Sequence, residues 1–525
     1  MSRDALKGAG ETCISYLDCL SSQCQNNRCT GQEVPLDASE QPETAEETAE
    51  RQTPREQIER VRETTKESIP EPKPLCQRPG CVEKRYILGG PGTEQMPHMK
   101  VDAKGNVVIF GTFQGAMNLG KLLVEAVSGY DTFITKLSPK GEFLWAQRFG
   151  GSGKDESKGL ALDKQGNIYI TGNFVGEIGT RPKNLRSFNP NNIDVFLAKL
   201  NTKGSVLWAY AALGRGSNSP DAIAVDSQGG VYVLGAYDGV MQFGKSSLWG
   251  KAGYDVFLLK VNADGVFQWM KSYGAVGYQL GRSIALDSKD NVYIAGEFAG
   301  ELSFGSFTLK PHAKNKAGGD LFLAKIQPDG KPLWAIAGGG VDNDIYPRVA
   351  VDKKDQVWWG GQCSNNASMG SFSLQNKDLN SIQICFAKVD KDGKILWAKT
   401  SVGPKFAELG GLSIDGQGRA LITGSFVDSI TFGETVLSGD NKMVNGFAVS
   451  LSDKGDWLWT LHLKSSDKNQ GYRNTFDPVH EHWYMSVTFH GAIDFLFYPK
   501  SFPFNMLTPE KNNRQDILLL QLRSK

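Results

Sequence analysis

The chain has 525 residues, and its 58 lysine and arginine side chains nearly balance 57 aspartate and glutamate side chains, giving a formal net charge of +1. This balance excludes the basic surface that nucleic-acid binding or attraction to an anionic membrane requires. The length suits two to four average domains or one large repeat domain. No apolar run approaches the roughly 18 residues of a membrane span. The polar start "MSRDALKGAGETC" is not a signal peptide.

Four of the eight cysteines crowd into "CISYLDCLSSQCQNNRC", residues 13–29. Residues 1–31 are too few to bury a core, so we predict a small module stapled by disulfides. A tetrathiolate zinc site is the alternative, but the paired C-x-x-C knuckles typical of zinc are absent. Disulfides indicate export, and we therefore expect an extracellular, cell-surface or periplasmic protein whose secretion signal is not in this sequence. A lipid anchor upstream of Ser2 is the one membrane attachment that we consider.

Residues 32–81 are rich in Glu, Thr and Pro and contain few large apolar side chains. Such a composition cannot offset the entropy of ordering the chain. We predict a flexible, charged linker between the module and the remaining residues.

From residue 82 onward the sequence is a repeat. An aspartate that ends a short apolar segment recurs at intervals of 61 to 65 residues, as Asp102, Asp163, Asp226, Asp287, Asp352, Asp415 and Asp477. In one unit, "RSIALD", "NVYIAGEF", "DLFLAKI" and "PLWAIAGG" read as four strands separated by turns. A fixed period of four-strand units predicts an all-β, seven-bladed β-propeller over residues 82–525.

The fourth strand, which carries a tryptophan, occurs only six times, because the chain ends at the third strand of the seventh unit, "QDILLLQLRSK". Before the first unit, "VEKRYILGGPG" matches the Gly-Gly-x-Gly end of "FLWAQRFGGSG". We predict that Lys84–Leu88 supplies the missing strand. Such a closure removes the exposed sheet edges that favour aggregation.

The pair "LDKQGNIYITGNF" and "IDVFLAKLNTKGSVLWA" resembles the SBBP repeat, a β-propeller repeat of secreted and surface bacterial proteins. The resemblance covers residues 82–525. It implies a propeller fold, an extracellular location and a binding role, since the repeat brings no catalytic motif. Units five and seven depart from the pattern, at "WWGGQCSNNAS" and "FDPVHEHWYMSVTFHG". These departures argue against a uniform ligand site around the ring.

Aligning the units predicts one disulfide inside the repeats. Where the other units place aromatic residues at the end of the second strand and the start of the third, unit five has Cys363 and Cys385. We predict that these two form a bond, provided that the geometry allows it. The remaining cysteines are expected to pair as Cys76–Cys81, Cys13–Cys24 and Cys19–Cys29.

The polar loops that join one unit to the next are the candidate ligand-binding face. Aligned eight positions before the repeated aspartates are Glu94, Asp155, Asn218, Gln279, Asp344 and Asn469. Solubility alone is an alternative explanation for these polar residues. The repeated aspartates themselves are expected to shape turns, because Asp accepts bonds from nearby backbone N–H groups.

Three histidines form a weaker candidate, a metal site. His480 and His482 would share one face of an extended segment, and His98 lies on the neighbouring unit. The repeated tryptophan also resembles the docking motif of propellers that bind pyrroloquinoline quinone, without a visible quinone pocket.

We therefore expect a non-enzymatic binding scaffold without a cofactor, whose partner is a protein or a glycan at the cell surface and not a nucleic acid. Two alternatives stay open. One is a structural spacer or coat component without a discrete site, and the other is a metal-dependent or quinone-dependent propeller enzyme.

Overall fold

The computed structural model describes residues 24–25, 28–29 and 79–524, with gaps at 91, 180–183, 275, 313–318, 365, 375–381, 404–405, 440–442, 466–469, 490–492, 499–503 and 508–515. Cys13, Cys19, Cys76 and Asn469 lie outside the described residues. Contacts divide the chain into two compact units, Met1–Pro72 and Lys73–Lys525. In the first unit, β1 (Cys24–Gln25) pairs antiparallel with β2 (Arg28–Cys29), which places Cys24 opposite Cys29.

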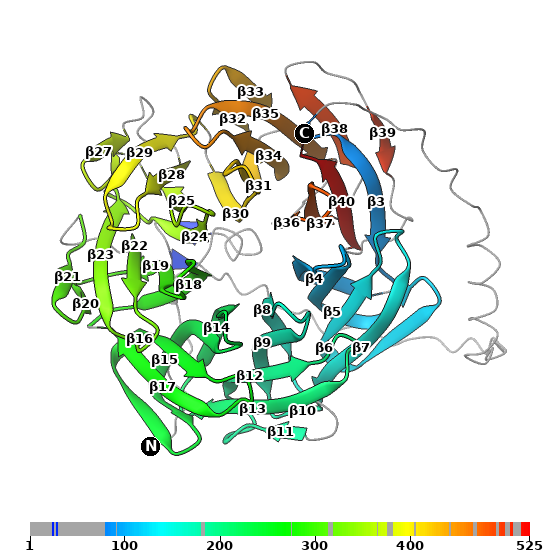
Figure 1. Ribbon diagram of the computed structural model, residues 1–525, viewed down its shortest axis with the longest axis vertical. Coiled ribbons are helices and arrows are strands. Elements are labelled where there is room, and N and C mark those ends of the chain that lie inside the picture. The colour runs from blue at the N-terminus through cyan, green and yellow to red at the C-terminus, as the bar shows by residue number, and fades with distance from the viewer. Residues whose placement is uncertain are drawn as a thin grey trace, which may run out of the picture. The chain divides into compact units, whose positions relative to one another are not determined.

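The second unit consists of strands and turns, without a helix among its described residues. A four-strand antiparallel ladder recurs along the chain (Figure 1). The first ladder contains β4 (Thr93–Val101), β5 (Val107–Leu119), β6 (Leu122–Leu137) and β7 (Phe143–Gly151). The next contains β8 (Glu156–Leu162), β9 (Ile168–Val175), β12 (Ile193–Leu200) and β13 (Val206–Gly214). After it come β14 (Asn218–Val225), β15 (Val231–Phe243), β16 (Ser246–Val261) and β17 (Phe267–Tyr273).

The same order continues in the following ladders. One contains β18 (Gln279–Leu286), β19 (Val292–Phe298), β22 (Asp320–Ile326) and β23 (Pro332–Gly339). Another contains β24 (Ile345–Val351), β25 (Val357–Cys363), β28 (Gln383–Val389) and β29 (Ile395–Thr400). The third contains β30 (Phe406–Ile414), β31 (Ala420–Val427), β34 (Asn445–Leu451) and β35 (Trp457–Ser465).

The ladder at the C-terminus is completed from the other end of the repeat region. Its strands are β36 (Gln470–Asp477), β37 (His482–Phe489) and β40 (Asp516–Arg523), and β3 (Val82–Leu88) pairs with β40 as the fourth strand. The sequence predicted this strand as Lys84–Leu88, and the observed strand begins two residues earlier, at Val82. Gly89, just after β3, also bridges to Asn118 in the first ladder.

Short hairpins leave several ladders between the second and third strands. They are formed by β10 (Glu177–Gly179) and β11 (Asn184–Arg186), β20 (Leu302–Phe304) and β21 (Phe307–Leu309), β26 (Ala367–Met369) and β27 (Phe372–Leu374), β32 (Ser429–Phe432) and β33 (Thr435–Ser438), and β38 (Ile493–Tyr498) and β39 (Phe504–Leu507). Three of these hairpins add to the fourth strand of the preceding ladder, through the pairs β10–β7, β26–β23 and β38–β35. The hairpins therefore connect neighbouring ladders by backbone hydrogen bonds.

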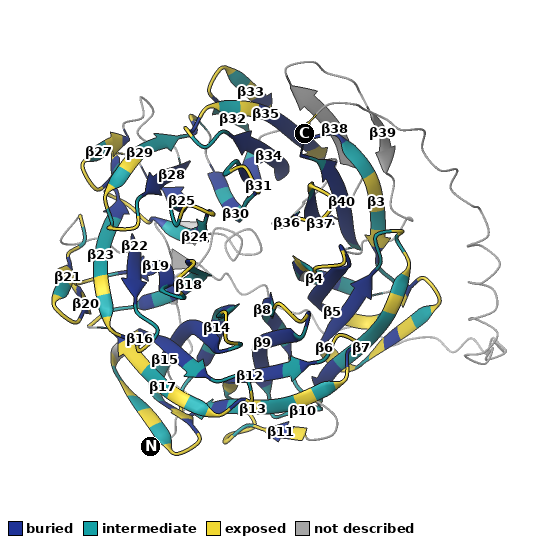
Figure 2. Ribbon diagram, viewed as in Figure 1, coloured by how far each residue is buried: buried dark blue, intermediate teal, exposed yellow. Residues whose placement is uncertain are grey.

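The first strands of the ladders, which we call the inner strands, lie around a common axis (Figure 1). Each contacts the inner strands on both sides, in the cyclic order β4, β8, β14, β18, β24, β30, β36 and back to β4. The apolar core lies between ladders. Leu88 and Leu519 of the C-terminal ladder, for example, pack in one cluster with Ile109 and Phe113 of the first. Figure 2 shows that β22 and β40 are almost entirely buried, whereas β23 and β3 consist mainly of intermediate and exposed residues.

Each repeated aspartate closes the turn after its inner strand, as predicted. Asp163 Oδ1 accepts the backbone N–H groups of Gln165 and Asn167 at 3.0 and 2.8 Å. Its Oδ2 accepts the Asn167 amide at 2.8 Å. Gly166 adopts φ +79°, which glycine reaches without the penalty of a side chain. These contacts are local, so the repeated aspartates serve the fold.

Neighbouring ladders are also joined through tryptophan and lysine. The Trp208 indole N–H and the Lys199 ammonium group both donate to the Ala263 carbonyl oxygen, at 3.2 and 3.0 Å, in the turn before the last strand of the next ladder. We call this pair of bonds the tryptophan–lysine latch. It recurs with Thr202, Pro328 and Lys391 as the accepting residues. A Cβ added to Gly265 would lie 3.0 Å from the Trp208 ring, so glycine lets the turn approach the indole.

The strand β3 makes a modified form of this latch. Lys84 is paired with Gln521 in the C-terminal ladder. The equivalent pair in the second ladder is Trp208 with Lys199, so Lys84 stands at the tryptophan position. The Lys84 ammonium group donates to the Pro139 carbonyl oxygen at 3.1 Å, in the corresponding turn of the first ladder. Tyr86 packs against Gly141 of the same turn. β3 therefore occupies the place of the missing tryptophan strand, with Lys84 in place of tryptophan.

We predict that a fragment of residues 91–525 aggregates or melts at a much lower temperature than a fragment of residues 76–525. Without β3, the β40 strand would expose its backbone N–H and C=O groups and Leu518, Leu520 and Leu522, which are buried at present. Soluble yield and thermal melting by circular dichroism measure the difference. Equal melting temperatures for the two fragments would contradict this role of β3.

Candidate functional site

The residues expected on a ligand-binding loop face lie at the entrances of the inner strands. Glu94, Asp155, Asn218, Gln279 and Asp344 all have side chains with 0% exposure. Asp155 Oδ2 accepts the Gly151 N–H at 2.9 Å, and Asp344 Oδ2 accepts the Gly340 N–H at 2.7 Å. These side chains are therefore buried rather than open to a ligand on the loop face, and the two aspartates accept backbone N–H groups at the ends of strands.

Carboxyl and amide groups meet at these entrances. Asn218 Nδ2 donates to Asp194 Oδ1 at 3.2 Å, and Asp194 begins the third strand of the preceding ladder, beside β13. One ladder earlier, the corresponding residues are Asp155 and Asp131. Burial, with a contribution from the charge of Asp131, raises the pKa of Asp155 to about 8. A raised pKa favours the protonated form of Asp155, so this carboxyl group resists ionisation at the place where the next ladder has the neutral Asn218.

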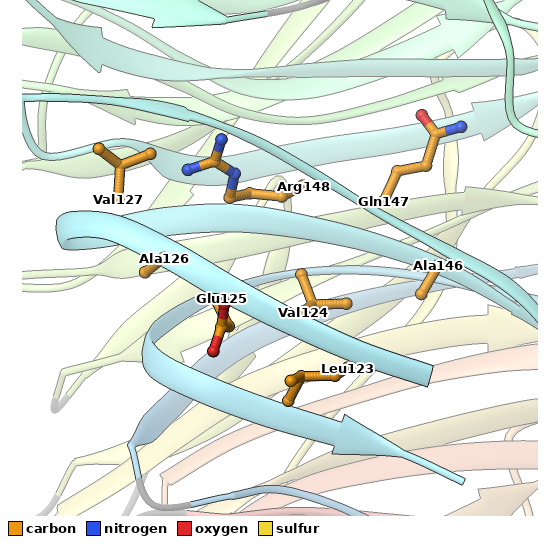
Figure 3. A pocket seen from close by; sticks show the side chains of 8 residues that line it. All are labelled: Leu123, Val124, Glu125, Ala126, Val127, Ala146, Gln147 and Arg148. Carbon is orange, nitrogen blue, oxygen red and sulfur yellow. The ribbon is translucent and has the colours of Figure 1, made fainter. Parts of the chain in front are cut away.

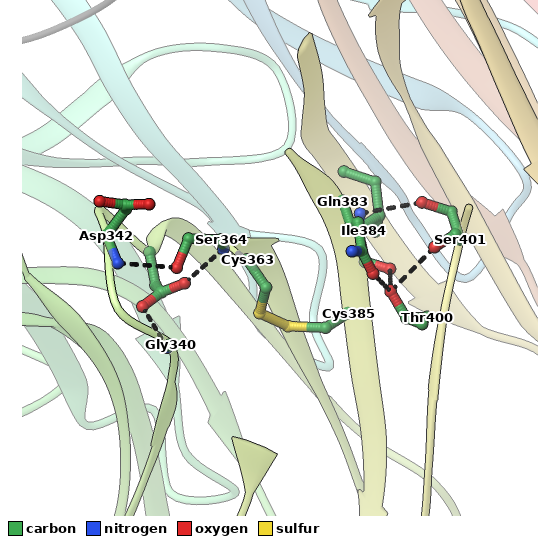
Figure 4. The surroundings of a disulfide bond; sticks show 10 residues. Gly340, Asp342, Cys363, Ser364, Gln383, Ile384, Cys385, Thr400 and Ser401 are labelled. Carbon is green, nitrogen blue, oxygen red and sulfur yellow. Dashed lines mark hydrogen bonds between the residues drawn. A yellow bond between two sulfur atoms is a disulfide. The ribbon is translucent and has the colours of Figure 1, made fainter. Parts of the chain in front are cut away.

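The predicted disulfide between Cys363 and Cys385 is present (Figure 4), with Cα atoms 5.8 Å apart. The two cysteines are diagonal neighbours, since Cys385 is paired with Gly361 and Cys363 with Gln383. In the first ladder, Phe113 and Phe133 fill the corresponding places with an edge-to-face contact. Cys81 is also disulfide-bonded. Its predicted partner Cys76 lies outside the described residues, and the pairing of the four N-terminal cysteines stays a prediction.

Two of the three candidate metal ligands lie side by side, with the His480 and His482 ring centroids 6.4 Å apart, but each is paired with a carboxylate. His480 Nδ1 lies 2.8 Å from Asp477 Oδ2, and His482 Nε2 lies 2.6 Å from Glu83 Oε2. His98 lies on β4, four residues before Asp102, while the His480 ring packs against Gly105 in the turn after Asp102. Within the part of the chain that the structure describes, no group of three or more His, Cys, Asp or Glu side chains is arranged for a metal ion. His480 and His482 therefore share one side, and His98 does not join them in a group of three ligands.

The structure also reveals a group of charged residues that sequence reasoning missed. Four or five positions before the repeated aspartates, the inner strands carry Lys158, Asp221, Arg282, Arg348 and Arg473. With Glu408 of β30, we call these six residues the axial cluster. All six are half-buried, so part of each side chain remains exposed to solvent. In five of the inner strands, a charged residue stands four or five positions before the repeated aspartate, and this pattern could have identified the cluster from the sequence.

A β-bulge or other register shift interrupts each inner strand near these side chains. The register shifts between Ser157 and Gly159, between Gly281 and Ser283, and at the equivalent places of the other inner strands. A bulge inserts one extra residue and bends the strand. The bulged residue is charged in three ladders, as Lys158, Asp221 and Arg282. Each of these three residues has no partner in the register of the adjacent strand.

Arg282 occupies the centre of one half of the axial cluster. Its Nε lies 3.0 Å from Glu297 Oε1, and its Nη1 lies 3.5 Å from Asp221 Oδ2. The guanidinium group stacks on the Tyr346 ring, 5.6 Å from the ring centre. Tyr346 adopts φ +55°, an unfavourable value for an aromatic residue. Its backbone N–H donates to Glu297 Oε1 at 2.7 Å, which holds it in this conformation.

His98 reports on the electrostatics of the axial cluster. Burial, together with the positive charges of Arg473, Lys158 and Arg348, lowers the pKa of His98 well below its usual value. The imidazole is therefore neutral at physiological pH. Positive charge from several inner strands thus reaches one point near the axis.

A separate shallow hollow of about 420 Å³ lies on the outer side of the first ladder, between β6 and β7 (Figure 3). Its one cationic side chain, Arg148, is bound to the buried Asp131, with Nη1 3.2 Å from Oδ2. The other lining residues are Leu123, Val124, Glu125, Ala126, Val127, Ala146 and Gln147. Because Arg148 is occupied by the fold, the axial cluster is the better candidate site.

Residues 144–173 match the family model of the SBBP beta-propeller repeat. An uncharacterized WD repeat-containing protein, L264 of Acanthamoeba polyphaga mimivirus, is 29% identical over 155 residues, which are 26% of this chain and 11% of that protein. The chain thus spans only a small part of the length of this relative. Among the described residues, no helix is long and apolar enough to cross a membrane.

Several solved propellers resemble the chain in fold alone. The Cps50 (Swd1) β-propeller domain of Myceliophteria thermophila has a TM-score of 0.41 and 6% identity, covering 85% of this chain and 100% of that domain. YCF48, solved with a bound D1 peptide, has a TM-score of 0.37 and 9% identity, covering 86% and 97%. The gluconolactonase XC5397 of Xanthomonas campestris has a TM-score of 0.31 and 12% identity, covering 85% and 99%.

We predict that Asp155→Asn stabilises the protein at pH 8 but not at pH 4. The folded-state pKa of Asp155, about 8, lies above the ordinary value of 3.8, so the wild type loses stability as pH rises between these values. Asn cannot ionise, and the difference between the two proteins should grow by about 1 kcal/mol per pH unit. Urea unfolding from pH 4 to 8 measures this difference.

The reverse substitution, Asn218→Asp, is the matched control. It introduces a second buried carboxyl group beside Asp194 and should steepen the loss of stability with pH. Parallel pH profiles for the wild type and Asp155→Asn would show that the folded state does not hold this proton.

Proposed function

We propose that this protein is an exported, non-enzymatic binding scaffold, built as a seven-bladed propeller over residues 82–525 and closed by β3. The cyclic contacts of the inner strands, the pairing of β3 with β40 and the bridge from Gly89 to Asn118 support the closed ring. In this proposal the axial cluster, rather than the loop residues predicted from the sequence, receives a protein or a glycan.

The observation that carries the proposal is a contrast between repeated and unrepeated positions. The aspartate turns, the tryptophan–lysine latches and the apolar faces of the strands recur from ladder to ladder, as the fold requires. The axial positions instead change from ladder to ladder, as Lys158, Asp221, Arg282 and Arg348. A propeller does not need charged residues of differing type and sign at equivalent places near its axis. Charged groups that stay partly accessible on a rigid frame are suited to ligand recognition.

Two further features support a polar ligand at this place. The stacked pair of Arg282 and Tyr346 offers a flat surface beside hydrogen-bonding groups, a combination that suits both sugars and peptide side chains. The unfavourable φ of Tyr346 is the kind of local strain that concentrates at functional sites.

Export is part of the proposal and rests on disulfide chemistry. The bond between Cys363 and Cys385 lies among buried side chains and closes a separation of 22 residues. Such bonds persist in oxidising compartments and are rare in the cytosol. The cysteine-rich N-terminal stretch points to the same environment.

We predict that the double variant Lys158→Gln/Asp221→Asn loses its partner in pull-downs from cell envelopes and on a glycan array. The two substitutions remove one positive and one negative charge from the axial cluster without changing the net charge. Wild-type protein immobilised at the same density provides the reference, and thermal melting checks that the variant is folded.

The double variant Arg186→Gln/Glu177→Gln is the matched control, because it removes an exposed ion pair, with Nε 2.9 Å from Oε2, on the outer hairpin β10–β11. It should keep every partner. If the folded axial variant also keeps every partner, the axial cluster is not the binding site.

A further inference from the structure

Two arginines of the axial cluster converge on one backbone carbonyl group. Arg348 lies on β24 and Arg473 on β36, and Gly410 lies on the inner strand between them, β30. Arg348 Nε donates to the Gly410 carbonyl oxygen at 2.9 Å, and Arg473 Nη1 donates to the same oxygen at 3.2 Å. Arg348 also donates from Nη1 to the Pro347 carbonyl oxygen at 3.1 Å. The shared acceptor fixes two guanidinium groups side by side.

These two arginines differ from the other cations of the cluster. Lys158 is paired with Glu156 at 3.0 Å, and Arg282 is paired with Glu297 and Asp221. Among the described residues, neither Arg348 nor Arg473 forms an ion pair with a carboxylate. A guanidinium group has five N–H donors, so both retain donors beyond those that bond the backbone carbonyl groups.

The charge near the two arginines is incompletely balanced. Burial, followed by the charge of Arg473, lowers the pKa of Arg348 to about 9, and burial likewise lowers the pKa of Arg473. Glu408 is a nearby carboxyl group that acts on both, but burial raises its own pKa. Two neighbouring half-buried cations without a carboxylate partner are costly, and an anion between them would relieve this cost.

We propose that Arg348 and Arg473 together bind one oxyanion, a carboxylate or a phosphate, through the N–H groups that do not bond backbone carbonyls. Paired guanidinium groups suit an oxyanion because their planar N–H groups match two oxygen atoms at once. The inference rests on the proposed binding function and names the chemical group that the partner presents. An acidic side chain, an acidic sugar or a phosphate group could each supply this oxyanion.

The test is calorimetric titration of the full chain with inorganic phosphate and, separately, with succinate. Arg473→Gln should weaken binding of the preferred anion about tenfold or more, since a charge-assisted hydrogen bond contributes about 1.5–3 kcal/mol. Glu408→Gln, compared at a pH at which Glu408 is ionised, should strengthen binding several-fold, because it removes the competing negative charge at nearly constant shape. Arg186→Gln removes an equal charge from the exterior and should leave the affinity unchanged.

The two axial variants change the affinity in opposite directions, which separates anion binding from damage to the fold. If Arg473→Gln does not fold, the direction of the Glu408→Gln effect decides. Unchanged anion affinity in folded Arg473→Gln, or no gain in Glu408→Gln, would overturn the oxyanion site. If neither anion binds the wild type while partner capture still depends on Lys158 and Asp221, the binding function stands and the oxyanion site is wrong. In the opposite case, the anion affinities of the wild type and the two axial variants follow the expected order, but capture of the partner does not depend on Lys158 and Asp221. That result would support the oxyanion site and refute the proposed binding function.

Discussion

The first four ladders are each attached to the next by a carbonyl oxygen that accepts two N–H groups, one from a tryptophan and one from a lysine of the preceding ladder. The bonds of Trp208 and Lys199 to the Ala263 carbonyl show the arrangement most clearly. Because the accepting turn is itself held by the local bonds of its own ladder, the contact fixes the distance between neighbouring ladders. The buried apolar clusters between ladders and the positions of the inner strands both depend on that distance. The charged residues of the axial cluster can therefore differ from one inner strand to the next while the ladders that hold them keep the same spacing.

The frame could be predicted from the sequence because its constraints repeat. The aspartate turns gave a period of 61 to 65 residues, and the period located the strand before the first unit. It also aligned Cys363 with Cys385, which are diagonal neighbours within bonding distance. Lys84 was harder to interpret. A lysine in place of a tryptophan gives no sequence signal, yet its ammonium group reaches the same carbonyl position, at Pro139, in the first ladder.

The site could not be predicted in the same way. Polarity placed Asp155 and Asp344 on a solvent-facing loop, but both carboxyl groups turn inward to accept N–H groups at strand ends. A polar residue next to glycines indicates a turn without telling which way the side chain points. The β-bulges of the inner strands could not be predicted either, because the expected alternation of inward and outward side chains assumes a regular strand. Lys158 and Arg282 are the extra residues at two of these bulges. The remaining signal for the axial cluster was a position that carries different charges in successive inner strands. Aligning the units to find what repeats draws attention away from such a position.

The central claim is that β3 occupies the latch position of the missing tryptophan strand, and the melting temperature of Lys84→Trp tests it most directly. A tryptophan at this register position should pack on Gly141 and donate to the Pro139 carbonyl, raising the melting temperature by about 1–2 °C. Arg85→Trp, one residue further along the same exposed strand, faces the other side and should give no gain. A melting temperature for Lys84→Trp that is unchanged or lower than that of the wild type would contradict the account.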